Sequence, residues 1–289
     1  MKYGIIGVNV GGAKTAEMLV ALAKKAEEVG MESLWTFEHV VVPLEYKSRY
    51  PGHPSGKMPG TPENHFIDPL IALSYVAAHT KTLRLGTGIN IVPQTNPLLL
   101  AKQVASLDVL SGGRLTLGMG VGWLAEEYAA MGTPFENRGA RMDDYLVALK
   151  KVWSGEVVEH QSEYLSWSGF KSYPLPVQKP HPPLVFGGSA PGVLRRIGRH
   201  GDGWIGGAGS KEALKKLCDT LDSEARAAGR DPASIEKTVM WPYAAEGPDA
   251  VKQYEDLGVA RLVIRWQALG GENPLAALEE IGNKLIAKG

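Results

Sequence analysis

Two residues with acid–base chemistry, Glu38 and His39, stand together at the end of the apolar run SLWTFEH. An imidazole at the end of a buried strand can transfer protons near neutral pH or donate a hydrogen bond to a developing anion. The alternative is a histidine that only fixes the following loop through a hydrogen bond. The spacing leaves both interpretations open, and we treat His39 and Glu38 as candidate catalytic residues.

A second candidate segment is LRLGTGINIVP, which carries glycines inside a predicted strand. Gly86 and Gly88 at such positions indicate a bulge or a close approach of the backbone to a ligand. Thr87 and Asn90 would offer polar groups at the same place. The alternative is a plain tight turn into the helix that follows.

The segment LGMGVGWL alternates glycine at Gly118, Gly120 and Gly122. It is not a dinucleotide-binding fingerprint, because GxGxxG would require glycine where Trp123 stands. We interpret the glycines as clearing space for a flat ring, the alternative being that they only relieve crowding between core layers. Trp123 is a candidate for the wall of a substrate pocket or, alternatively, for packing.

Two later glycine-rich loops precede predicted helices and are suited to an anion. Gly188, Ser189 and Ala190 lead into one helix, and Gly206 and Gly207 lead toward another. The N–H groups at a helix N-terminus bind phosphate readily. A glycine-rich turn before a helix is common, so neither loop alone identifies an anion site.

Composition excludes several classes of function. The 289 residues include 31 Lys+Arg against 31 Asp+Glu, so the basic character of a nucleic-acid-binding protein is missing. The single cysteine, Cys218, cannot form an internal disulfide, and the seven histidines show no metal-binding spacing, so we expect no metal site. No apolar run reaches the roughly 18 residues of a membrane span, and the first residues are typical of a strand rather than a signal peptide. We therefore expect a cytoplasmic protein that binds a small molecule.

Short apolar runs alternate with amphipathic helical patterns along the whole chain. The eight strand candidates are 3–8, 33–37, 83–89, 114–119, 184–186, 203–205, 235–240 and 261–266. Strict alternation predicts parallel strands with right-handed crossovers, and eight βα units close into a (β/α)₈ barrel. A doubly wound open sheet is the alternative. We expect one domain over residues 1–289.

Two stretches interrupt the repeat and are predicted to be insertions. Residues 43–64, rich in proline and glycine, follow the second strand and would lie at the C-terminal face of a barrel, where active sites form. Residues 155–183 lie between the fourth helix and the fifth strand and contain a predicted hairpin. Several helices are expected to end at a glycine in the left-handed conformation: Gly30, Gly112 or Gly113, Gly201 and Gly258.

Taken in order, these blocks resemble the luciferase-like flavin and deazaflavin oxidoreductases, and among them the coenzyme F420-dependent class. The resemblance runs from AEEVGMESLWTFEH through DPLIALSYVAAHTKTLRLGTGINIVP to PPLVFGGSAPGVLRR and GDGWIGG. It implies a (β/α)₈ barrel whose cofactor ring lies over the C-terminal ends of the strands. A homodimer is a further expectation from the family.

The resemblance also implies roles for particular residues. It places a non-prolyl cis peptide at Gly88–Ile89 against the ring, next to Thr87 and Asn90, and it gives His39 a role in proton transfer. The remaining cofactor-binding positions that it implies are Gly120, Val121, Gly122, Gly188, Ser189, Ala190, Gly206 and Gly207. The sugar-phosphate dehydrogenases of this class carry a glutamate at the position of Trp123, so the resemblance favours an apolar or aromatic substrate here.

Three functions follow as alternatives. The first is hydride transfer between coenzyme F420 and a small organic substrate, and the second is an FMN-dependent monooxygenase that uses oxygen. The third is a catalytically silent barrel that only binds a cofactor. Three basic residues stand where either cofactor could use them: Arg195, Arg196 and Lys211.

Overall fold

The short apolar runs of the sequence form a closed parallel sheet. The structure is a computed structural model that describes residues 1–11, 15–269 and 273–286. Within these ranges, eight strands form the barrel wall in the order that they have along the chain: β1 (Lys2–Ile6), β2 (Ser33–Thr36), β3 (Arg84–Thr87), β5 (Leu115–Gly120), β8 (Leu184–Gly187), β9 (Gly203–Gly206), β10 (Glu236–Trp241) and β11 (Arg261–Arg265). A short segment, β4 (Asn90–Ile91), continues the third strand and pairs with β5.

Closure decides between the two predicted α/β architectures. The last strand pairs with the first, Lys2 lying opposite Arg261, and β3 pairs with β5, Leu85 lying opposite Leu115. An open sheet would leave two unpaired edges. The predicted (β/α)₈ barrel is therefore confirmed, and the doubly wound sheet is wrong.

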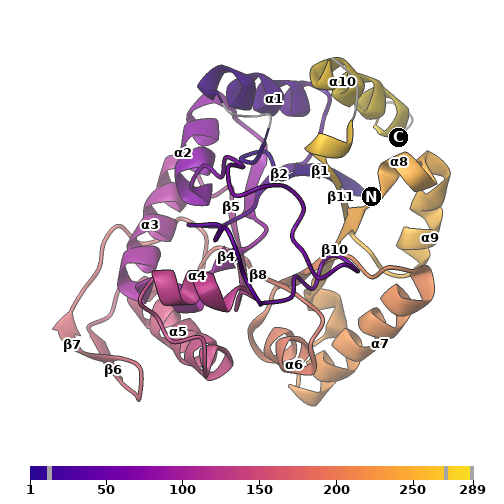
Figure 1. Cartoon of the computed structure of the whole chain (residues 1–289). Helices are drawn as coiled ribbons and strands as arrows, with labels where there is room; N and C mark the ends of the chain where they lie inside the picture. Colours follow the sequence, from indigo (N-terminus) through magenta and orange to yellow (C-terminus); the bar gives the residue numbers. More distant parts are fainter. Residues whose placement is uncertain (12–14, 270–272, 287–289) are drawn as a thin grey trace.

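The helices form a ring around the strands (Figure 1). Five of the ten α-helices within the described ranges begin at a residue whose side chain accepts a hydrogen bond from the first turn: Thr15, Asp68, Asn96, Ser210 and Asn273. Their bounds are α1 (Ala16–Glu28), α2 (Pro69–His79), α3 (Pro97–Leu110), α4 (Ala125–Ala130), α5 (Arg138–Trp153), α6 (Pro191–His200), α7 (Lys211–Ala227), α8 (Tyr243–Glu246), α9 (Val251–Asp256) and α10 (Pro274–Leu285). Short 3₁₀ turns occupy Val92–Gln94, Pro232–Ser234, Pro248–Ala250 and Trp266–Leu269. No helix within the described ranges combines the length and the apolar character needed to cross a bilayer.

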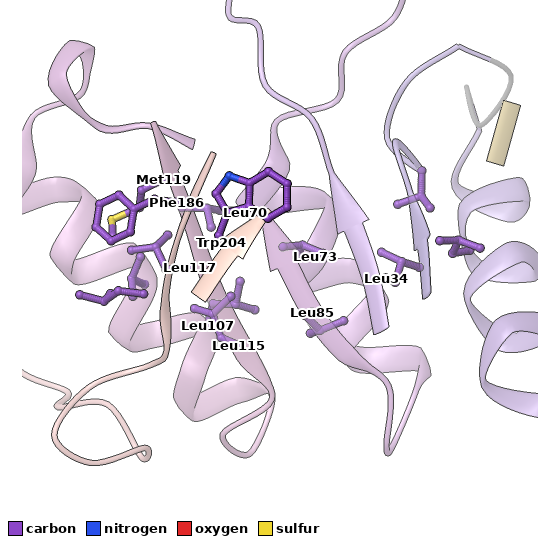
Figure 2. Close-up of a cluster of buried hydrophobic side chains, with 14 of the residues drawn as sticks. Leu34, Leu70, Leu73, Leu85, Leu107, Leu115, Leu117, Met119, Phe186 and Trp204 are labelled. Carbon is purple, nitrogen blue, oxygen red and sulfur yellow. The ribbon is translucent and has the colours of Figure 1, made fainter. Parts of the chain in front are cut away.

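The hydrophobic core has two layers because the strands are buried on both faces. The outer layer, between sheet and helices, includes Leu73, Leu85 and Leu117, with Phe186 and Trp204 among its largest side chains (Figure 2). The inner layer fills the barrel itself with Ile6, Trp35, Val185, Ile205 and Val263. Because the inner layer fills the barrel, no channel runs through it among the described residues. A ligand site must therefore lie at one of its ends.

The predicted glycine helix ends are confirmed at three of the four sites. Gly30, Gly112, Gly113 and Gly258 have φ between +66° and +80°. Gly201 is the exception, with φ −86° and an extended conformation. A Cβ at Gly201 would lie 3.0 Å from Ile197 Cα, so this glycine lets the chain pass close to the last turn of α6 on its way to β9.

Both predicted insertions are present. Residues 43–64 contain no helix or strand and pass over the mouth of the barrel (Figure 1). The second insertion holds the hairpin of β6 (Val158–Gln161) and β7 (Ser166–Phe170), which lies outside the ring of helices. Asp144 of α5 accepts hydrogen bonds from His160 Nε2 and Ser162 Oγ, both 2.8 Å long, and so fastens this hairpin to the barrel.

Candidate active site

The imidazole of His39 is held by a carboxylate that the sequence did not single out. His39 Nδ1 lies 2.9 Å from Oε2 of Glu127, and the two side chains are 8% and 1% exposed. Oε1 of Glu127 also accepts hydrogen bonds from the backbone N–H groups of Val40 (2.6 Å) and Val41 (3.3 Å). Because a carboxylate only accepts, Nδ1 carries the proton and Nε2 is the nitrogen left to act on a ligand.

Glu38, the other candidate catalytic residue, faces away from His39. Its Oε1 accepts a 2.9 Å hydrogen bond from Asn90 Nδ2, and its Oε2 accepts one from the backbone N–H of Ile91. Burial raises the pKa of Glu38 to about 8, against the lowering effect of the Ile91 hydrogen bond. Glu38 therefore fastens β4, and Glu127 is the carboxylate that pairs with His39.

One feature of the sequence points to Glu127. Glu126 and Glu127 are consecutive acids in the first turn of a helix that directly follows a barrel strand. Carboxylates at that position lie at the mouth, because the C-terminal ends of parallel strands share one face. Only the folded chain shows that one of them reaches His39, 88 residues away.

The predicted bulge in the third strand is present. The strand is interrupted between Thr87 and Asn90, and the Gly88–Ile89 peptide is cis, as the resemblance implied. Gly88 and Ile89 are partly exposed at the mouth, whereas Thr87 is fully buried. The Thr87 hydroxyl donates to Gly118 O (2.7 Å) and accepts from Gly118 N (2.9 Å), so it joins β3 to β5 and is not free for a ligand.

Glycines around the bulge make room for the bulge itself. A Cβ at Gly118 would lie 1.7 Å from Thr87 O, and one at Gly120 would lie 1.8 Å from Ile89 Cδ1. A Cβ at Gly187 on β8 would lie 2.9 Å from Ile89 Cγ2. Gly120 and Gly187 therefore admit the Ile89 side chain, and Gly118 admits the Thr87 carbonyl, which differs from the expectation that the alternating glycines clear space directly for a flat ring.

Glycine is required at position 86 for a different reason, which is the packing inside the barrel. A Cβ there would lie 2.2 Å from Cε3 of Trp35, which fills the inner core layer. This glycine is explained by packing alone. The bulge interpretation applies to Gly88.

Val121 and Gly122 form a fixed turn after β5. Gly122 has φ +67°, and a Cβ there would lie 2.9 Å from Ile91 Cγ2. The hydroxyl of Tyr128 donates to Val121 O at 2.8 Å. The segment is thereby held next to β4, on the same side of the mouth as the bulge.

Trp123 is covered by aromatic rings of the first insertion. Its ring centroid lies 5.5 Å from that of Tyr46, 5.2 Å from that of Tyr50 and 6.0 Å from that of His39, all edge to face. The insertion is tied to α4, since Glu126 Oε1 accepts from Lys47 N at 2.6 Å and from Ser48 N at 3.2 Å. Although burial raises the pKa of Glu126, these hydrogen bonds lower it to about 2. The loop is therefore an ordered cover over Trp123.

The two predicted anion loops remain exposed at helix N-termini. Gly188 (φ +106°), Ser189 and Ala190 are exposed, and no side chain caps α6. Trp204 Nε1 donates a 2.9 Å hydrogen bond to Gly188 O, which fixes the start of this loop. Gly206 is buried, whereas the space beside Gly207 is open to 4 Å.

Two of the three predicted basic partners are engaged elsewhere. Arg196 is buried and donates to Asp143, with its Nε 2.5 Å from Oδ1, and to Gly139 O. Lys211 Nζ lies 2.8 Å from both carboxylate oxygens of Glu246. Arg195 is exposed on α6. Backbone N–H groups are therefore the main donors that these loops offer to a phosphate.

A cavity of about 340 Å³ adjoins the imidazole. Its walls come from the end of the second strand region and from the end of the first insertion: His39, Val40, Val41, Val42, Pro62, Asn64 and Phe66. The rings of His39 and Phe66 meet edge to face at 5.3 Å. Trp123, the predicted pocket residue, lies behind His39 and does not line this cavity.

Comparison with known proteins identifies the family of this chain. The luciferase-like monooxygenase family matches residues 5–256. The F420-dependent hydroxymycolic acid dehydrogenase of Mycobacterium tuberculosis is 30% identical over 258 residues, which cover 88% of this chain and 64% of that protein. The F420-dependent glucose-6-phosphate dehydrogenase of Amycolatopsis mediterranei is 29% identical over 244 residues, covering 80% of this chain and 68% of that protein.

Solved structures share the fold. An F420-dependent secondary alcohol dehydrogenase, in complex with an F420–acetone adduct, superimposes with a TM-score of 0.79 at 17% identity, over 99% of this chain and 98% of the other. This likeness shows that the fold is shared. The family match and the sequence relatives place the chain among oxidoreductases that use a flavin or deazaflavin. The protein belongs to the luciferase-like monooxygenase family.

Proposed function

We propose that this oxidoreductase transfers a hydride between coenzyme F420 and a small organic substrate, with His39 exchanging the accompanying proton. The observation that carries the proposal is the His39–Glu127 pair, 2.9 Å apart beside a cavity at the C-terminal face of the barrel. Relatives at 29–30% identity that are described as F420-dependent support the choice of cofactor.

The side chains around His39 define what it can do. With Nδ1–H directed at Glu127, Nε2 can take the proton of a substrate hydroxyl or, once protonated, return it to a carbonyl oxygen. Glu127 also stabilises the imidazolium that forms when Nε2 is protonated, in the way that a buried carboxylate supports a catalytic histidine. Phe66 and Trp123 flank the ring edge to face and limit its rotation.

The mouth of the barrel fits a flavin or deazaflavin cofactor. Gly88 and Ile89 present a bulged backbone there, and Asn90 Oδ1 is buried without a hydrogen-bond partner among the described residues, which leaves an acceptor for a ligand donor. Gly120, Val121 and Gly122 border the bulge. The uncapped N-terminus of α6, with Gly188, Ser189 and Ala190, and the open loop at Gly206 and Gly207 would hold the phosphate. When bound, the cofactor supplies the hydride chemistry, and the protein supplies position and electrostatics.

An FMN-dependent monooxygenase is the second candidate. The family name and the backbone phosphate sites support it equally, since both cofactors carry a phosphate. The His39–Glu127 pair favours the first candidate, because a positioned proton donor and acceptor is what hydride transfer to or from a carbonyl requires.

Fluorescence titration of the cofactor-free protein with F420 and, separately, with FMN tests the cofactor. We expect micromolar or tighter binding of F420 and at least tenfold weaker binding of FMN. The reverse preference would contradict the proposal and favour the monooxygenase.

His39→Asn tests the catalytic role once F420 is bound. We expect turnover to fall about 10²- to 10⁴-fold, the range for loss of a positioned acid–base group, while the F420 dissociation constant changes little. Binding without turnover in the unaltered protein, across a broad screen of alcohols and ketones, would favour the catalytically silent barrel instead.

A further inference from the structure

A second cavity, of about 580 Å³, lies at the end of the barrel opposite His39. Its lining comes from the C-terminal half of α7, from the start of β10 and from the residues that precede β11. Because both strands begin here, this is the N-terminal face of the barrel, away from the proposed hydride-transfer site. Its volume lies within the range of small-molecule sites.

Lys237 is the most buried charged side chain in the lining of this cavity, with 9% of its side chain exposed. Its Nζ lies 2.8 Å from Oδ1 of Asp222 on α7, which is the one hydrogen bond that it makes among the described residues. An ammonium group has three N–H donors, so two are left for a ligand or for water. The backbone leaves room beside this group, because a Cβ at Gly258 would still lie 3.8 Å from Nζ.

The charges around the cavity are balanced once the partners of Glu236 are taken into account. Lys2 and Arg261 both donate hydrogen bonds to the Glu236 carboxylate. The other charged lining groups carry two positive and two negative charges: Lys237, Arg226, Asp222 and Asp231. A simple anion would meet two carboxylates here, and a simple cation would meet two basic groups. The balance therefore favours a ligand that is neutral overall and carries one charge of each sign.

Two of these four groups have no charged partner. Arg226 is exposed in the last turn of α7 and forms no ion pair or side-chain hydrogen bond among the described residues. Asp231 is exposed after the turn that follows α7, and its carboxylate accepts one hydrogen bond, from Ala233 N at 3.0 Å. Since the guanidinium and the carboxylate line the same cavity without pairing with each other, both are available to one ligand.

We propose that this cavity binds an aliphatic amino acid in its zwitterionic form. The ligand carboxylate would accept hydrogen bonds from Lys237 Nζ and from the Arg226 guanidinium, and the ligand ammonium would donate to Asp231. The carbons between the two charges would lie on the apolar part of the lining, which is formed by Pro232, Ala233, Ile235 and Ala260. This site does not depend on which cofactor the other end of the barrel binds.

The test is isothermal titration calorimetry of the full chain with ω-amino acids from glycine to 6-aminohexanoate at low ionic strength. Each amino acid is compared with the alkanoate and the alkylamine of the same length, which carry one charge only. We expect at least one amino acid to bind about tenfold or more tightly than either analogue, and its dissociation constant to rise with added salt. Equal binding of an amino acid and its analogues, or no binding of any amino acid at millimolar concentration, would overturn the proposal.

Two variants assign the two charges of the ligand. Arg226→Gln should raise the dissociation constant of the amino acid about tenfold and leave that of the alkylamine unchanged. Asp231→Asn keeps an oxygen that can accept from Ala233 N but removes the negative charge. It should weaken binding of the amino acid without weakening binding of the alkanoate.

Lys216→Gln is the matched control for Arg226→Gln. Lys216 is an exposed base on the same helix that does not line the cavity, and its loss changes the net charge by the same amount. We expect the control to bind the amino acid like the unaltered protein. An equal loss of binding in Lys216→Gln and Arg226→Gln would show that only the net charge matters and would overturn the proposal.

Discussion

Ionisable side chains gather at both ends of this barrel, but their partners differ. Carboxylates at the N-terminal end are paired with a cation, and those at the C-terminal end are held by neutral groups. At the N-terminal end, Arg261 opens β11 and reaches Glu32 with two hydrogen bonds of 2.7 Å. The same guanidinium donates to Glu236, at the start of β10, and to Thr238 Oγ1 at 3.1 Å. Although burial raises the pKa of Glu32 and of Glu236, the neighbouring Arg261 lowers both overall.

The C-terminal end holds its carboxylates without a cation beside them. Glu38 is bonded to an amide and a backbone N–H, and burial raises its pKa to about 8. Glu127 faces a histidine and two backbone N–H groups. Asn90 Oδ1 has no partner among the described residues.

The comparison distinguishes ionisable groups that stabilise the fold from ionisable groups that can take part in proton transfer. Pairing a buried charge with a fixed opposite charge removes its tendency to exchange protons and supports the native state. A carboxylate held only by neutral donors remains able to support a proton on a neighbouring group. Perturbed groups of this second kind concentrate at functional sites, and in barrels such sites lie at the C-terminal face.

The largest expected effect comes from Glu127→Gln. The amide can present its NH₂ to Nδ1, which would move the imidazole proton to Nε2 and leave no base facing the cavity. We expect turnover with F420 to fall about 10²- to 10⁴-fold, as for loss of a carboxylate that orients a catalytic histidine. The pH profile of turnover should lose the limb that belongs to His39, a change that a purely structural role would not produce. Unaltered turnover and pH profile would show that His39 acts without this carboxylate.

Next in size is Arg261→Met, at the other end. It leaves Glu32 and Glu236 close together without their cation, and we expect the free energy of unfolding in urea to fall by about 3 kcal/mol. This is the lower end of the range for a broken buried ion pair, because both carboxylates are partly exposed. F420 binding should be unaffected. Lys252→Met, which breaks an exposed pair with Asp256, is the control and should not change stability measurably.

The effect of Glu38→Gln depends on pH, and per pH unit it is the smallest of the three. Between about pH 4.5 and 8 the unfolded chain has released the Glu38 proton while the folded protein retains it, so stability falls as pH rises. The slope from this group is at most about 1.4 kcal/mol per pH unit. Glu32 and Glu236, with lowered pKa values, stabilise the fold above about pH 4.5 and add no slope in this window.

The measurement is the free energy of unfolding of both proteins at pH 5, 6 and 7.5. The difference between the unaltered protein and Glu38→Gln should change across this series, with Glu38→Gln gaining relative stability toward pH 7.5. Parallel curves would show that the carboxylate is ionised in the folded protein throughout. Such a result would remove the contrast between the two ends.

Much of the fold could be predicted because it depends on local patterns. Apolar runs at a spacing of one βα unit indicated the strands, and glycines such as Gly30 and Gly258 indicated helix ends. Gly201 shows the limit of this reasoning. A glycine after a helix is compatible with either sign of φ, and only the packing against Ile197 selected the extended conformation.

The candidate site could be predicted in part. His39 and the Gly88–Ile89 bulge follow from residues within one strand and its end, whereas the partner of His39 does not. Glu38 is adjacent in sequence, but successive residues of an extended chain point to opposite sides. The imidazole therefore turned to Glu127 and the carboxylate of Glu38 turned to Asn90.

The sequence by itself determined the order of the elements, the end of the barrel where polar groups collect and the family of oxidoreductases to which the chain belongs. These depend on residue type, on spacing and on the rule that parallel strands end at one face. The tertiary structure decided which acid pairs with His39, that Arg196 and Lys211 are engaged by carboxylates, and that Gly118 and Gly120 make room for the bulge. These contacts join groups that are far apart in the chain. Only the folded structure brings such groups together, so no local sequence pattern indicates them.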